Sequence, residues 1–161
     1  MINMIWGTAT TPGIRDGLVN FVGSRIEGGE RGFGECVAMG VIDGKGLLGA
    51  VIYHNYNPES GVIEISGAAT HSRWLTRRVL WAMYNYPFND AGCQMVVQRS
   101  SEKDIRLARI LTAYGFESYK IARLRGRTED EIVYTLTDDR WRNNGFHRRI
   151  IDGKVESAKA A

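Results

Sequence analysis

The spacing of hydrophobic residues switches along the chain between the period of a helix and the period of a strand. Apolar residues that recur every three or four positions predict three amphipathic helices, over 12–26, 75–86 and 105–114. The first helix follows Thr11 and Pro12, which are typical N-cap and first-turn residues, and Gly115 ends the third. Each helix therefore has one apolar face to bury against another layer.

Short apolar runs bounded by turn residues predict the strands. They cover 1–6, 35–43, 47–53, 62–66, 93–98, 119–125 and 132–136. Within 62–66, Ile63 and Ile65 share one face while Glu64 and Ser66 share the other. The order β-α-β-β-β-α-β-α-β-β predicts an α+β fold with a mixed, mostly antiparallel sheet and helices on both faces.

Composition narrows the class of protein further. The chain has 161 residues, 43% hydrophobic and 24% charged, as expected of one globular domain. No apolar run reaches the ~18 residues of a membrane span, and no signal peptide is visible at the start. Cys36 and Cys93 lie in apolar runs, which favours small buried hydrophobes in a reducing cytoplasm. No histidine, cysteine or carboxylate spacing indicates a metal site.

The last part of the chain differs from the rest in composition. We expect a globular domain over 1–137 and a basic, aromatic tail over 138–161, which interleaves arginine with Trp141 and Phe146. This pattern suits phosphates and bases. The net charge of the whole chain is only +3, however, so nucleic acid is a weakly indicated partner. A helix packed on the sheet or an arm in a homodimer explains the tail equally well.

The order of elements, with the stretches 74–88 and 109–116, resembles the GCN5-related N-acetyltransferase (GNAT) family. The first stretch is similar to the central helix of the branch that acetylates ribosomal-protein N-termini. The second, ending in Gly115-Phe116, is similar to the family's fourth helix. Among such proteins the chain looks most like the compact phage and prophage branch. The resemblance implies direct acetyl transfer from acetyl-CoA to a primary amine of a small molecule or a protein, in the cytoplasm.

The resemblance also implies where acetyl-CoA would bind. Pantetheine would lie along the fourth strand and the diphosphate at the start of the next helix, where unpaired N–H groups favour an anion. The implied cofactor-binding residues are Gly67, Ala68, Ala69, Ser72, Arg73, Trp74, Leu75, Thr76, Arg77 and Asp104. Ser72 and Trp74 stand where the family has glycines, so Arg73, Arg77 and Arg78 are expected to compensate by charge. Asp104 is equally well explained as a helix cap.

Two residues are candidates for proton transfer. Glu64 is a carboxylate within an aliphatic strand, at the place where many family members carry their general base, and His54 follows the preceding strand. In the alternative interpretations neither residue is catalytic: Glu64 is paired with an arginine, and His54 lies in a loop. Leu111 stands where the family has its tyrosine acid, and Tyr114 is expected to pack instead.

The acceptor site and the alternative functions follow from the same resemblance. Phe33, Tyr53 and Tyr56 are expected to border the acceptor amine. One alternative is a phage-type protein of this fold that binds or modifies nucleic acid. The other is a non-catalytic relic with a structural role, favoured by the bulky residues in the diphosphate loop. Binding of acetyl-CoA discriminates between the relic and the enzyme.

Overall fold

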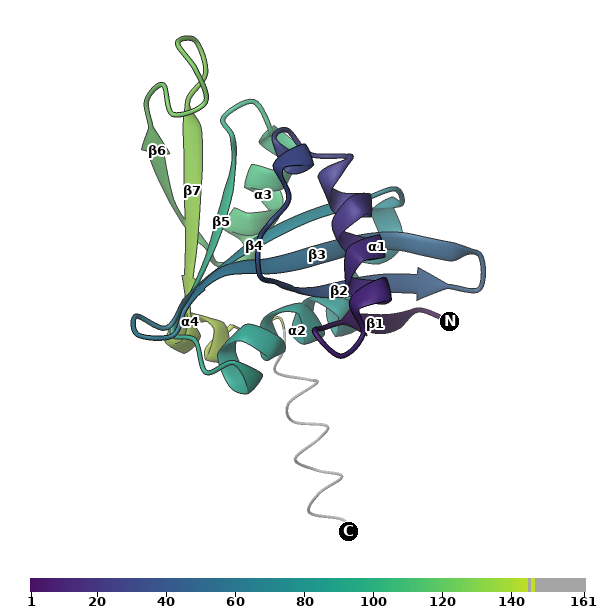
Figure 1. The fold of residues 1–161 in the computed structure, drawn as a ribbon. Helices are drawn as coiled ribbons and strands as arrows, with labels where there is room; N and C mark the ends of the chain where they lie inside the picture. The colour runs from purple at the N-terminus through teal and green to yellow at the C-terminus, as the bar shows by residue number, and fades with distance from the viewer. Residues whose placement is uncertain (145, 147–161) are drawn as a thin grey trace. The chain divides into compact units, whose positions relative to one another are not determined.

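The computed structural model describes residues 1–144 and 146 (Figure 1). The chain divides into a first compact unit, Met1–Gln98, and a second that begins at Arg99. Among the described residues, seven strands are hydrogen-bonded in the order β1-β2-β3-β4-β5-β7-β6, which confirms the predicted α+β fold. The expected boundary between a domain 1–137 and a tail 138–161 stays a prediction, and most of that tail lies outside the described residues.

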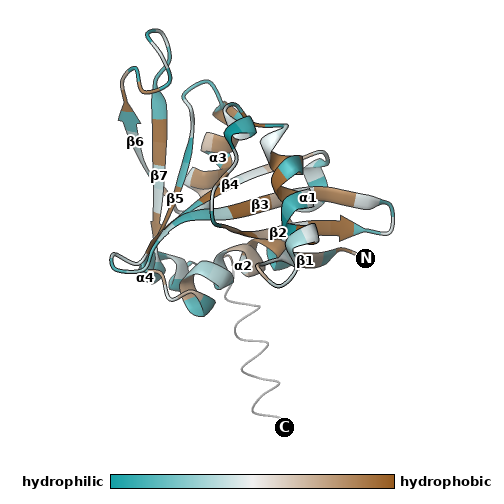
Figure 2. Ribbon diagram, in the orientation of Figure 1, coloured by the Kyte–Doolittle hydropathy of each residue, from teal (hydrophilic) through white to brown (hydrophobic). Residues whose placement is uncertain are grey.

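The first unit is built on an antiparallel meander. Its strands are β1 (Asn3–Gly7), β2 (Val37–Asp43), β3 (Gly46–Asn57) and β4 (Val62–Ala69). The predicted hairpin turn between β2 and β3 is confirmed, because Asp43 Oδ1 accepts hydrogen bonds from the N–H groups of Lys45 at 2.8 Å and Gly46 at 3.2 Å. Figure 2 shows β3 changing from hydrophobic to hydrophilic along its length.

The strand β5 (Met95–Ser101) begins in the first unit and runs parallel to β4. Within the described residues their ladder covers three pairs and ends at Glu64 and Val97. Beyond that point β4 continues to Ala69 against β3, where Ala69 pairs with Gly49. The carboxyl half of β4 therefore keeps its pairing on the β3 side after the parallel ladder has stopped.

Helix α1 (Pro12–Gly23) covers one face of the meander, as Figure 1 shows. Leu18 and Val22 are buried there with Ala38, Ala50 and Ile52 of the strands. Thr11 precedes the helix as predicted, but its side chain does not cap it. Its Oγ1 instead accepts from the Thr8 N–H at 2.8 Å. The helix ends at Gly23, three residues short of the predicted end.

Helix α2 (Arg77–Asn85) lies on the opposite face, and a π-helical turn (Tyr86–Asp90) follows it. Tyr53 of β3 points to this face, where it is 1% exposed and its hydroxyl donates to the Met83 carbonyl at 2.6 Å. Burial raises the pKa of Tyr53 well above its ordinary value. The prediction that Tyr53 borders the acceptor is therefore wrong, because alternation along β3 turns it into the core.

The second unit holds α3 (Ile105–Tyr114), β6 (Glu117–Ile121), β7 (Glu131–Thr137) and α4 (Asp138–Arg142). Leu111 and Tyr114 are buried, and the Tyr114 hydroxyl accepts from Trp141 Nε1 at 3.0 Å. The predicted packing role of Tyr114 is confirmed. Gly115 ends α3 with a φ of 116°, which glycine adopts without strain. The strand β6 begins two residues before its predicted start.

Candidate functional site

The candidate site lies on the α1 face of β3 and β4, inside the first unit. His54 lies within β3, because this strand continues to Asn57. The alternative interpretation, that His54 is a loop residue, is therefore wrong. His54 lies opposite Glu64 of β4, and Ile52 lies opposite Ser66. Paired residues of antiparallel strands project from the same face. Register alone therefore gathers His54, Glu64 and Ser66, which are far apart in sequence.

Both ring nitrogens of His54 have a polar neighbour. Nδ1 lies 3.3 Å from Glu64 Oε2, and Nε2 lies 2.8 Å from Ser66 Oγ, a hydrogen-bond distance. The carboxylate beside Nδ1 favours the tautomer that carries its proton there. Nε2 then keeps its lone pair and accepts the hydrogen bond from the Ser66 hydroxyl. The result is a continuous row of serine, imidazole and carboxylate across two strands.

The histidine is shielded from water. It is 8% exposed, and the ring of Phe33 meets it edge-on with centroids 5.0 Å apart. Burial lowers the pKa of His54 from its ordinary value of 6.5, while the negative charge of Glu64 opposes that shift. At neutral pH the imidazole is therefore uncharged, the form that a general base requires. The prediction that Phe33 borders an acceptor beside this base stays a prediction.

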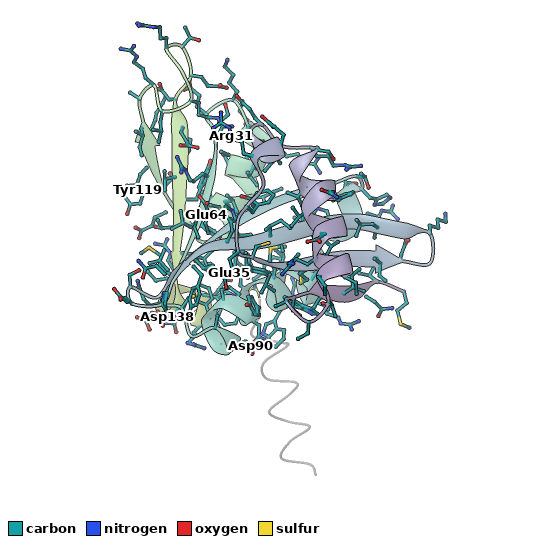
Figure 3. All side chains as sticks on the ribbon, viewed as in Figure 1. Arg31, Glu35, Glu64, Asp90, Tyr119 and Asp138 are labelled. Atoms are coloured by element: carbon teal, nitrogen blue, oxygen red, sulfur yellow. The ribbon has the colours of Figure 1, made fainter. Side chains whose placement is uncertain are left out.

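A bulge in β3 brings a second side chain to the Glu64 carboxylate. The β3–β4 register shifts between His54 and Asn57, and Asn55 there has a φ of +50°, a left-handed conformation that asparagine tolerates. This turn directs Asn55 Nδ2 to Glu64 Oε2 at 2.9 Å. Figure 3 labels Glu64 on its strand. Glu64 is thus held by an amide donor and sits beside an imidazole, and it shares this sheet face with Ser66.

The loop before α2 is ordered by its own side chains. A 3₁₀ turn (Ser72–Trp74) is capped by His71, whose Nδ1 accepts from the Arg73 N–H at 3.1 Å. Thr76 then caps α2 by accepting from the Val79 N–H at 3.2 Å. Thr76 was one of the predicted cofactor-binding residues, and capping of α2 accounts for its presence here. Arg77 and Arg78 lie in the first turn of α2 and Arg73 lies in the 3₁₀ turn before it. Their predicted contact with a diphosphate stays a prediction.

Trp74 stands at a loop position where the family that the chain resembles has a glycine, and its packing shows how the bulky side chain is accommodated. A Cβ on Gly49 of β3 would lie 2.5 Å from Trp74 Cε3, so the indole rests directly on the Gly49 backbone. The glycine that makes room for the indole is therefore in β3, at Gly49, and not in the loop. The tryptophan side chain is thus turned to the sheet.

The small residues at the end of β4 have packing roles. A Cβ on Gly67 would meet Val51 Cγ1 at 2.9 Å, and Ala68 packs on the α1 core. Close packing between neighbouring strands therefore accounts for Gly67. The backbone of Gly67, Ala68 and Ala69 lies beyond the end of the β4–β5 ladder, so its predicted contact with pantetheine stays a prediction.

The remaining predicted residues are placed as follows. Asp104, in the second unit, caps α3 by accepting from the Leu107 N–H at 3.0 Å, as the alternative interpretation held. Tyr56 is 49% exposed, and its hydroxyl donates to the Ala91 carbonyl at 3.3 Å. Ser66 escaped the sequence analysis as a functional residue. Its position two residues after Glu64, on the same strand face, was the signal that could have identified it.

Among the described residues, no cluster of three or more histidines, cysteines or carboxylates is placed to hold a metal ion. Within that same part of the chain, no helix is long and apolar enough to cross a membrane.

Comparison with solved structures identifies the fold. No protein-family model and no curated protein sequence matches the chain. Ribosomal-protein-S5-alanine acetyltransferase from Vibrio fischeri aligns with a TM-score of 0.56 and 17% identity, over 66% of this chain and 63% of that one. Dodecameric spermidine N-acetyltransferase from Vibrio cholerae aligns with a TM-score of 0.68 and 12% identity, over 88% of this chain and 96% of that one. The chain spans less than two thirds of the length of the first.

Proposed function

We propose that this chain, which has the fold of the GNAT acetyltransferases, transfers an acetyl group from acetyl-CoA directly to a primary amine. The observation that supports this most is that His54 is buried and uncharged and lies beside Glu64. Glu64 is the residue of β4 at which the β4–β5 ladder ends. An amine must lose a proton when it attacks a thioester, and a base at that place serves this step. We also propose that the protein is cytoplasmic, that it belongs to the compact phage and prophage branch, and that it forms a homodimer.

The residues divide the work between binding and proton transfer. Acetyl-CoA supplies the activated acetyl thioester. Arg73, Arg77 and the first turn of α2 hold the diphosphate by charge and N–H donors. His54 takes the proton that the attacking amine loses, and Glu64 stabilises the imidazolium that results. Backbone N–H groups of Gly67 to Ala69 polarise the thioester carbonyl, because donors aimed at a developing oxyanion lower the barrier.

The acceptor is a small molecule or a protein terminus that carries a primary amine. The two solved structures described above act, by their names, on a ribosomal protein's alanine and on spermidine. We expect Phe33 and Tyr56 to border the acceptor, because Phe33 touches the ring of His54 and Tyr56 leaves half of its side chain in solvent. Which amine is used is decided by screening both classes.

Removing Arg73 is expected to weaken acetyl-CoA binding about 10-fold to 100-fold, because a charge-assisted hydrogen bond contributes roughly 1.5–3 kcal/mol. Calorimetric titration of wild type and Arg73→Ala with acetyl-CoA measures this. Arg25→Ala is the control for net charge, since Arg25 lies over Phe21 at the end of α1, on the other face. Equal weakening in both variants would contradict the loop site. No binding to wild type would favour the non-catalytic relic.

Replacing Glu64 by glutamine is expected to move the acidic limb of the kcat/KM profile to lower pH. The charge of Glu64 raises the pKa of His54 against the larger lowering by burial, so its removal leaves the pKa still lower. His54 then stays neutral to a lower pH. Because it also binds a proton less strongly, kcat/KM on the plateau of the profile is expected to fall. A pH–rate profile beside an NMR titration of the His54 ring tests this. A limb moved to higher pH would contradict the assignment.

A further inference from the structure

The two nitrogens of His54 leave no direct approach for a substrate proton. Nδ1 lies beside Glu64, and the hydroxyl of Ser66 occupies Nε2 at 2.8 Å. The ring of Phe33 packs against the imidazole in a T-shaped arrangement, and only 8% of His54 is exposed. A base in this position must either lose its serine partner before it acts, or receive the proton through that serine.

Ser66 is placed for the second course. It is half-buried, more accessible than His54, and lies two residues past the end of the β4–β5 ladder. It is also next to Gly67, the first of the residues that would lie along pantetheine. Its hydroxyl can donate to one atom and accept from another at the same time. A hydroxyl held by an imidazole that a carboxylate orients is activated in this sense.

We propose that Ser66 is the substrate-facing end of a Ser66–His54–Glu64 proton relay, a catalytic role that rests on the proposed acetyl transfer. As the amine nitrogen bonds to the carbonyl carbon, its N–H proton passes to Ser66 Oγ. The Ser66 hydroxyl proton passes to His54 Nε2 in the same event. Ser66 ends unchanged, the amine has lost one proton and His54 has gained one. The tetrahedral intermediate then breaks its C–S bond and releases CoA as the thiolate. His54 gives its proton to that sulfur or to water, which restores the free base for the next turnover.

Ser66→Ala is expected to lower kcat about 10²-fold, the lower end of what general acid–base groups contribute, with the KM for acetyl-CoA unchanged. Ser66→Thr keeps the hydroxyl on a strand and is expected to restore most of the rate. Ser118→Ala, on β6, is the matched serine control and keeps the wild-type rate. A wild-type kcat in Ser66→Ala would overturn the relay. A loss that Ser66→Thr does not restore would also overturn it.

Two measurements separate a relay from a merely structural hydroxyl. In mixtures of light and heavy water the wild-type rate is expected to curve with deuterium fraction, because two protons move together, whereas Ser66→Ala gives a straight line. A straight line for wild type would refute the relay.

The second measurement needs no substrate, so it stands even if acetyl transfer is disproved. ¹⁵N NMR of the His54 ring is expected to show the proton on Nδ1 in wild type. In Ser66→Ala the loss of the donor at Nε2 is expected to increase the other tautomer. A wild-type ring protonated at Nε2 would overturn the relay, whereas absence of turnover with the expected tautomer would overturn only the acetyltransferase proposal.

Discussion

His54→Gln is expected to lower kcat by about 10²–10⁴-fold, the range that a positioned general base contributes. Glutamine keeps a polar side chain of similar reach but cannot take up a proton near neutral pH. The wild-type ring is well suited to this step, since burial lowers its pKa and keeps it uncharged. The acidic limb of the pH–rate profile is expected to disappear with the histidine. Steady-state kinetics from acid to neutral pH measure both effects.

His71 provides the contrasting variant. Its ring caps the 3₁₀ turn at 3.1 Å from the Arg73 N–H, so His71→Ala disturbs the loop expected to bind the diphosphate. Its effect is expected on the KM for acetyl-CoA, with kcat retained. If His54→Gln changed KM alone, or left the acidic limb in place, the assignment of His54 as the base would be refuted.

Gly7→Ala is expected to reduce the free energy of unfolding by about 3 kcal/mol, which is more than 100-fold in the folding equilibrium. A Cβ on Gly7 would lie 2.3 Å from the Cα of Arg15 and 2.4 Å from its backbone nitrogen. These atoms belong to α1, so neither can rotate away as a side-chain end would. The helix must shift from the strand or the strand must bend. Denaturant unfolding at fixed slope measures the loss.

Gly17→Ala is the matched control in the same unit. Nothing lies within 4 Å of a Cβ built on Gly17, and the residue is inside α1. Alanine is favoured over glycine in a helix by roughly 0.8–1 kcal/mol, so this variant is expected to be more stable than wild type. Opposite signs for two identical substitutions would confirm the close approach of α1 to β1. Equal signs would contradict it.

Local rules explain why so much of the fold was predictable. The alternation of Ile63 and Ile65 with Glu64 and Ser66 correctly assigned the two faces of β4, because strand geometry fixes which side chains point together. The Asp43 turn and the Asp104 cap were predictable for the same reason, since each is a side-chain contact within three residues. These are properties of short stretches, and they do not depend on what packs against them.

The candidate site depended on contacts between distant residues. His54 looked like a loop histidine because Asn55 and Asn57 are poor strand formers, yet β3 extends to Asn57 by pairing with β4. The resemblance placed Tyr53 beside the acceptor, but the pleat of β3 directs it to the opposite face from His54, into the core. Trp74 looked too bulky for its loop because the glycine that makes room for it lies on another strand, at Gly49.

By itself, then, the sequence determined the order of the strands and of the three main helices, the Asp43 turn, the Asp104 cap, and Glu64 as a carboxylate on one face of its strand. Those features follow from the backbone preferences of neighbouring residues. Only the tertiary structure decided that His54 lies between Glu64 and Ser66, because the register of β3 against β4 sets that meeting. Register is a pairing between segments, and a one-residue slip would have turned the histidine to the other face.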